Sequence, residues 1–102
     1  MTIKRWAARK DANHDLLRRC ARELGLSWHD IGRPVDALVG AFGLTVACEV
    51  KTDDGKLNPE QCVFLNEFQG DARVLRSVED VCALHRDLKR RALALRNSDV
   101  GG

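Results

Sequence analysis

Apolar and polar residues alternate through the middle of the chain in the pattern of β-strands. In residues 44–50, Leu-Thr-Val-Ala-Cys-Glu-Val, the even-numbered positions are apolar and are expected to face a core, while the odd-numbered positions face the other side of the sheet. Residues 35–39 predict a second strand, and residues 40–43 contain the glycines of a reversal. We therefore expect a hairpin in which the chemistry is separated from the packing.

The length of the reversal decides which charged side chains meet. Facing residues of a hairpin share one side of the sheet, so a loop with an even number of residues places Asp36 on the face of Glu49. A three-residue loop would place Asp36 on the opposite face, but two-residue loops are the most common. With the ammonium group of Lys51 on the same side, this arrangement suits a metal-dependent phosphodiesterase.

Three segments have the apolar spacing and the capping residues of helices. The first is expected over residues 11–24, the second begins after the cap Asn58 and ends at Gly70, and the third begins at the capping pattern of Ser77 and Asp80. The expected buried stripes of the first and last helices are Leu16, Leu17, Cys20, Ala21 and Leu24, and Val81, Leu84, Leu88, Ala92 and Leu95. In the second helix, one face is shared by Gln61, Phe64, Leu65 and Phe68.

Short strands at residues 26–31 and 72–75 complete the predicted order of helix, three strands, helix, strand and helix. This order indicates an α/β fold in which a small mixed β-sheet is flanked by helices. A chain of 102 residues with 44% hydrophobic content can form one core, so we expect one domain at residues 1–96 and a flexible C-terminal tail at residues 97–102.

Composition and charge narrow the class of protein. No apolar run of about 18 residues exists and no apolar signal region follows the basic N-terminus, so we expect a soluble, intracellular protein. The four cysteines lack C-x-x-C spacing and are expected to be reduced thiols. The net charge of +2 is divided into +5 over residues 1–22, −6 over residues 23–80 and +3 over residues 81–102. The basic ends favour binding of phosphate groups. Alternatively, these basic residues lie on ordinary solvent-exposed faces of helices.

Four segments resemble the motifs of the PD-(D/E)XK nucleases, most closely those of the small virus-type replication-repair (VRR-NUC) branch. Residues 32–40 resemble the segment that carries the first metal-binding aspartate, here Asp36, and Glu49-Val50-Lys51 resembles the E-x-K element. Residues 56–61 resemble the motif whose glutamine lies on the following helix, and residues 76–80 resemble the segment before the last helix.

The resemblance covers residues 12–88 and implies a restriction-endonuclease-like core. One residue separates Pro34 from Asp36, which are adjacent in the family, and Asp15 is the nearest counterpart of the family's acidic residue on the first helix. The implied activity is metal-dependent hydrolysis of DNA phosphodiester bonds by an endonuclease, in a bacterium or a phage-infected host. By analogy with the branch, the preferred DNA would be branched, flapped or a four-way junction.

The resemblance also assigns roles to residues. Lys51 would lie against the attacking water and Gln61 would orient the water or Lys51, with Mg²⁺ or Mn²⁺ as the cofactor. The implied catalytic residues are Asp36, Glu49, Lys51 and Gln61. The implied metal ligands are Asp36, Glu49, the backbone carbonyl of Val50 and, for a second ion, Asp15. The residues expected to contact DNA are Lys4, Arg5, Arg9, Lys10, Arg18, Arg22, Arg33 and Lys56.

Each of these interpretations has a simpler alternative. Asp36 could cap a turn, Glu49 and Lys51 could form an exposed pair of little energetic value, and Gln61 could reach back to the backbone N–H of Asn58. The chain could also be a catalytically inactive DNA-binding module or a phage protein-interaction domain. Salt-dependent DNA affinity would distinguish the interaction domain from the other two.

A two-fold homodimer is the expected assembly. Resolution of a four-way junction by such a small domain needs two sites related by a two-fold axis, and dimers of this symmetry are the most common oligomers. The apolar stripe of the last helix, over residues 81–95, spans about 21 Å, which is more than a small core covers, so its distal end is expected to pack on the partner. A frayed C-terminal turn is the alternative.

Overall fold

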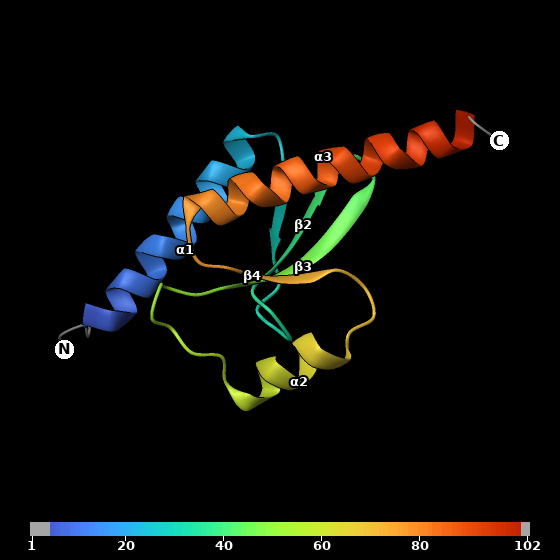
Figure 1. Cartoon of the computed structure of the whole chain (residues 1–102). Helices are drawn as coiled ribbons and strands as arrows, with labels where there is room; N and C mark the ends of the chain where they lie inside the picture. Colours follow the sequence, from blue (N-terminus) through green and yellow to red (C-terminus); the bar gives the residue numbers. More distant parts are fainter. Residues whose placement is uncertain (1–4, 101–102) are drawn as a thin grey trace.

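The structure is a computed structural model that describes residues 5–100, with side chains from Lys10 to Asn97 (Figure 1). Its elements follow the predicted order of helix, three strands, helix, strand and helix, so the α/β class is confirmed. They are α1 (Arg5–Glu23), β1 (Ser27–Asp30), β2 (Ala37–Ala41), β3 (Leu44–Val50), α2 (Pro59–Glu67), β4 (Ala72–Leu75) and α3 (Val78–Val100).

The strands form one mixed sheet in the order β1-β2-β3-β4, in which β3 and β4 are parallel and the other pairs antiparallel. The reversal between β2 and β3 contains two residues, Phe42 and Gly43, with φ angles of 55° and 79°. Positive φ at both positions is the geometry of a turn that matches the twist of a hairpin. Because the reversal is this short, β2 begins and ends two residues later than predicted, and Asp36 lies just before it.

One face of the sheet packs on α1 and α3, and α2 lies on the opposite side (Figure 1). We call the first side the core face; it carries the buried side chains of Ala37, Val39, Val46, Cys48, Val50 and Leu75. Burial of these apolar groups against the helices is the main favourable contribution to folding. We call the other side the site face; it carries Asp36, Leu38, Ala47, Glu49 and Val74.

The helices differ from the predicted ones at their ends. α1 begins at least six residues earlier than predicted, because residues 5–10 contain no glycine or proline to interrupt a helix. α3 likewise continues through Val100, so residues 97–100, expected in the tail, are helical. Leu16 is 46% exposed and Leu95 58% exposed, so both predictions of burial are wrong. Their helices instead present Leu17 and Leu88, both fully buried, to the core.

Two expectations concern the chain as a whole. The four cysteines are free thiols, of which Cys48 is buried and Cys62 exposed. Across the part of the chain that the structure describes, no helix combines the length and the apolar character needed to cross a membrane.

Candidate active site

The two predicted carboxylates meet where the pairing of β2 and β3 ends. The last pair of the register joins Ala37 to Cys48, and one further step sets Asp36 opposite Glu49. The residues that flank a two-residue turn form a hydrogen-bonded pair, so alternation makes positions 36 and 49 a non-hydrogen-bonded pair, in which facing side chains lie closest. Asp36 therefore shares a face with Glu49, as the two-residue loop predicts.

The Asp36 side chain is fastened to β3. The N–H of Val50 donates a hydrogen bond to Asp36 Oδ2 over 2.8 Å, so the carboxylate occupies the place of a backbone acceptor. The N–H and C=O of one strand residue point to the same neighbouring strand, so the Val50 carbonyl faces the β2 side of β3. The carboxylate thus contacts the next strand and does not cap a turn of its own segment.

Glu49 is only 1% exposed, although it lies on the face that was expected to be free for chemistry. Burial, together with a hydrogen bond and repulsion from the Asp36 carboxyl, raises the pKa of Glu49 to about 8, while Lys51 and Lys10 act in the opposite direction. The expected separation of packing and chemistry is therefore wrong here, because Ala47 on the same face is buried too. An exposed pair of Glu49 and Lys51 is excluded.

Gln61 serves two purposes at once. Its Oε1 accepts a hydrogen bond from the backbone N–H of Asn58, and its backbone N–H donates to Asn58 Oδ1, which completes a capping box at the start of α2. Its Nε2 donates to Glu49 Oε2 over 2.5 Å. The cap, which was the simpler alternative for Gln61, is present, and it fixes the amide so that its NH₂ points at the Glu49 carboxylate.

Two ammonium groups influence the carboxylates. Lys51 follows β3 on the same side as Glu49 and is half-buried, and Lys10 comes from the exposed end of α1. Both lower the pKa of Glu49, against the larger effects of burial and Asp36. Sequence reasoning assigned Lys10 to DNA contacts alone, and its place near Glu49 depends on how α1 crosses the sheet.

A hollow of about 360 Å³ opens beside Asp36 between α1 and the segment that follows β1. Asp15, the predicted ligand of a second ion, lines this hollow. Its carboxylate lies 3.0 Å from Arg18 and 3.2 Å from Arg19. The hydrogen bond from Arg18 is the main reason that the pKa of Asp15 is lowered. Asp15 is therefore already engaged by cations at the rim of the site.

Asp30 gathers a network on the same side of the hollow that sequence reasoning did not find. Trp28 Nε1 donates to Asp30 over 2.8 Å, Arg18 Nη1 donates over 2.7 Å, and His14 Nε2 lies 2.8 Å away. Although burial opposes it, these three contacts lower the pKa of Asp30 to about 2. The network joins α1 to β1, and no local sequence pattern could have indicated it.

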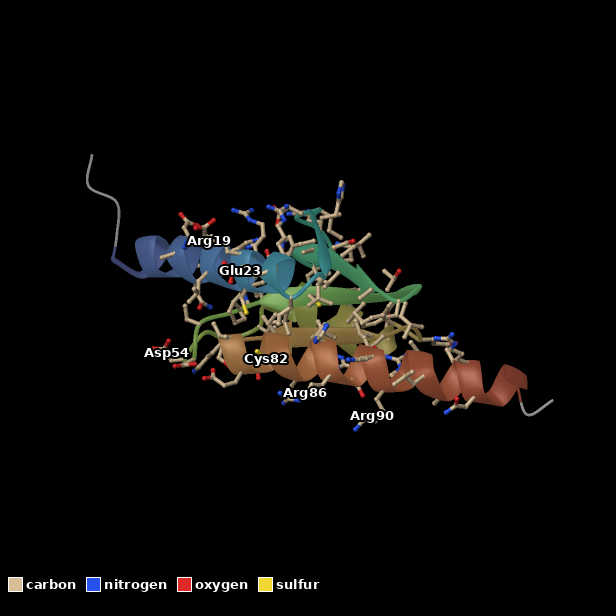
Figure 2. The ribbon with its side chains drawn as sticks, turned by 90° about the horizontal axis from the view of Figure 1, so that it is seen from above. Arg19, Glu23, Asp54, Cys82, Arg86 and Arg90 are labelled. Atoms are coloured by element: carbon tan, nitrogen blue, oxygen red, sulfur yellow. The ribbon has the colours of Figure 1, made fainter. Side chains whose placement is uncertain are left out.

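The predicted DNA contacts are spread over several environments. Arg18 is engaged by Asp15 and Asp30, and Arg22 donates to the carbonyl of Trp28 over 3.3 Å. Lys10, Arg22, Arg33 and Lys56 are exposed. Lys4 lies outside the described residues, as do the side chains of Arg5 and Arg9. On α3, Arg86 and Arg90 point away from the sheet (Figure 2).

Two further polar residues at the site were missed. Asn13 donates to the carbonyl of Lys51 over 2.9 Å, and Arg76 Nη1 donates to the carbonyls of Thr52 and Gly55 in the loop after β3. A signal for Asn13 was available, because it lies four residues before Leu17 on the buried stripe of α1. Arg76 follows β4 directly, so the parallel pairing of β4 with β3 sets it beside Lys51.

The donors fit a hard divalent cation with few protein ligands. Among residues whose side chains are described, no group of three or more His, Cys, Asp or Glu side chains is arranged to hold a metal. The carboxylates of Asp36 and Glu49 and the Val50 carbonyl supply oxygen ligands, which Mg²⁺ prefers when several waters complete its shell. Burial and the Asp36 carboxyl raise the pKa of Glu49, and a bound cation would favour the ionised form of this carboxyl.

Comparisons of the chain with models of known protein families, with curated proteins and with solved structures return no match. The functional interpretation therefore depends on the geometry of this site and on the resemblance of the sequence motifs.

Proposed function

We propose that the chain is a Mg²⁺- or Mn²⁺-dependent endonuclease of the PD-(D/E)XK class, in its VRR-NUC branch, which hydrolyses DNA phosphodiester bonds. The observation that carries the proposal is the buried Glu49 carboxyl beside the carboxylate of Asp36, with the amide of Gln61 as donor. Burying a carboxyl next to another lowers stability, and such an arrangement is typical of a functional site.

Each residue then has a defined task. Asp36 and Glu49, with the Val50 carbonyl, would hold the ion, which when bound supplies Lewis-acid chemistry to the scissile phosphate. Lys51 stabilises the hydroxide or the charge that develops on the phosphate. Gln61 keeps the Glu49 carboxylate oriented through its Nε2, because its own Oε1 is fixed by the cap of α2.

The proposed substrate is DNA, with a preference for branched, flapped or four-way-junction forms. Lys10 on α1 and Lys56 in the loop before α2 are exposed cations. Contacts of this kind position the phosphate backbone without reading sequence, which suits an enzyme that recognises DNA structure.

The test is a cleavage assay with labelled single-stranded, duplex, flap and four-way-junction DNA. We expect cleavage with Mg²⁺ or Mn²⁺ and none after addition of chelator. Salt-dependent binding without cleavage on any substrate would contradict the proposal and favour an inactive DNA-binding module. Absence of both binding and cleavage would favour a protein-interaction domain.

We further propose that the enzyme acts as a two-fold homodimer. Support comes from the distal half of α3, where Leu93 is 49% exposed and Leu95 58% exposed. Light scattering at micromolar concentration tests the assembly, with Leu95→Gln, on the stripe of residues 81–95, as the variant expected to shift it toward the monomer. A wild-type monomer that cleaves flaps would contradict the dimer and leave one-sided flap processing.

A further inference from the structure

Two side chains from distant parts of the sequence hold the segment that follows β3. Arg76 Nη1 donates to the carbonyls of Thr52 and Gly55, each over 2.7 Å, and lies 3.4 Å from the carbonyl of Asp53. Asn13 Nδ2 donates to the carbonyl of Lys51 over 2.9 Å. Arg76 and Asn13 therefore hold residues 51–55 through backbone carbonyls, while Thr52 Oγ1 donates to Asp54 Oδ1 within the segment over 3.2 Å.

The topology explains why these groups meet. β3 and β4 are parallel, with Val50 opposite Leu75, so the chain leaves both strands at the same edge and Lys51 comes beside Arg76. The amide of Asn13 spans this edge, since it lies 3.4 Å from the carbonyl of Arg76 as well as bonding that of Lys51. One side chain of α1 thus bridges the ends of the two strands.

Arg76 is itself fixed in place. Its backbone N–H donates to Asp80 Oδ2 over 2.8 Å, and Asp80 lies in the first turn of α3, capped by Ser77. The loop that the guanidinium holds reaches Asp54, which lies near the start of α3 (Figure 2). The bonds from the guanidinium to this loop all come from one nitrogen, Nη1, whose two N–H groups are fixed in the guanidinium plane, whereas the N–H groups of an ammonium rotate freely.

This arrangement fixes the backbone around Lys51. Lys51 is the first residue after β3, where strand pairing no longer fixes the chain on the β2 side, and its N–H donates to the carbonyl of Leu75 over 3.0 Å. The N–H bond to Leu75 fixes the backbone before the side chain, and the bond from Asn13 to the Lys51 carbonyl, with the bonds from Arg76 to the following loop, fixes it after the side chain. The direction of the ammonium group relative to Glu49 depends on that backbone.

We propose that Arg76 and Asn13 form a carbonyl clamp that positions Lys51 for catalysis. The inference rests on the proposed nuclease function, because Lys51 has a catalytic role only if that function holds. Neither Arg76 nor Asn13 is assigned a contact with substrate. Arg76 is a positioning residue whose cation is used to order a loop, although an arginine beside a phosphodiesterase site would ordinarily be assigned to phosphate binding. A misplacement of a catalytic group by about 1 Å can lower a rate about 100-fold.

The test compares Arg76→Gln and Asn13→Ala with Arg73→Gln. Arg73 is the matched control, because it is half-buried like Arg76 and makes ion pairs with Asp71 and Asp87, which do not involve the Lys51 loop. All three variants are expected to melt earlier than the wild type. Only the two clamp variants are expected to lose kcat, by about 10- to 100-fold per folded molecule, while KM for DNA and the midpoint of Mn²⁺ activation change less than about twofold.

Hydrogen exchange gives a measure that does not depend on activity. We expect faster amide exchange in residues 52–56 of Arg76→Gln, an intermediate rate in Arg76→Lys, and the wild-type rate in Arg73→Gln. A wild-type kcat in Arg76→Gln, or unchanged exchange in that segment, would overturn the clamp. If the wild-type protein cleaves no DNA, the proposed function fails instead, and the exchange rates alone decide whether the clamp holds the loop.

Discussion

The core face and the site face are built from alternate residues of the same strands, yet they are packed in opposite ways. On β2, Val39 of the core face is fully buried, whereas its neighbour Leu38 on the site face is 40% exposed. On the core face the neighbours are apolar side chains of α1 and α3, and the helix over the site face, α2, has no buried residue of its own. Burial of apolar side chains, and its contribution to stability, is therefore greater on the core face than on the site face.

The site face also buries what the core face excludes. Glu49 is the only charged or polar residue among the buried side chains that the structure describes. Its neighbours along β3, Cys48 and Val50, are buried on the core face. On the site face, a buried carboxyl beside a second carboxyl lowers the stability of the folded protein. Functional sites commonly lower stability in this way because their chemistry requires such groups.

The largest expected effect is the loss of cleavage when a proposed catalytic residue of the site face is substituted. Asp36→Asn, Glu49→Gln and Lys51→Ala should each lower metal-dependent cleavage by at least about 100-fold and leave most DNA affinity intact, because the positioning contacts lie elsewhere. The control is Thr45→Ala, at the exposed end of β3 on the same face. Cleavage by Lys51→Ala at the wild-type rate would remove Lys51 from the mechanism.

A smaller effect separates the two faces by stability. Val39→Ala removes a fully buried side chain and should lower the free energy of unfolding by about 2 kcal/mol, and Leu38→Ala should lower it by less than about 1 kcal/mol although it removes more atoms. Urea denaturation of both variants gives the comparison. Equal losses would mean that the site face is covered in solution, for example by a second copy of the chain.

The sequence predicted most of the fold because its strong signals are local. The alternation in β3, the glycines of the reversal and the cap at Asn58 fixed the order of elements and brought Asp36 to the face of Glu49. The ends of elements were less accurate, since no local signal shows that residues 5–10 belong to α1 or that Gly40 stays in β2. Helix ends and strand ends depend on tertiary contacts as well as on propensity.

The site was predicted less completely than the fold. Alternation within β3 indicates on which side Glu49 lies, but its burial depends on α2, which is connected through a loop whose course has no periodic signal. The side chains that hold Lys51 and its loop come from α1 and from the end of β4. Asn13 lies 38 residues before Lys51 in the sequence, and Arg76 lies 24 residues after Thr52. Contacts over such distances follow from topology and not from spacing.

The third prediction concerns the energetic penalty of burying Glu49. In the folded protein its pKa is raised to about 8, whereas an unfolded glutamate titrates at about 4.3, so the folded state binds the proton more tightly. Stability should therefore be highest below about pH 4 for this group and fall as the pH rises toward about 8. Glu49→Gln keeps an acceptor for Gln61 and removes the charge.

In chelator at pH 8, Glu49→Gln should be more stable than the wild type by about 1 to 2 kcal/mol, and the difference should shrink toward pH 4. Thermal melts of both proteins across this range measure it. A variant that is less stable than the wild type at every pH would mean that the carboxyl is well solvated, which would weaken the contrast between the faces.

The smallest expected effect lies at the edge of the core face, where charges are paired and not crowded. Asp71 accepts hydrogen bonds from Arg73 and Arg91, and although burial opposes it, these bonds lower the pKa of Asp71. A carboxylate with a lowered pKa stabilises the folded state above its unfolded pKa of about 3.9, and this contribution is lost as the pH falls through the folded value. Asp71→Asn should therefore lower stability at pH 7 by about 1 kcal/mol and have little effect near pH 2. The opposite pH dependence of Asp71→Asn and Glu49→Gln, measured in the same melts, is the sharpest test of the comparison, because a paired surface carboxylate and a crowded buried one must respond to acid with opposite signs.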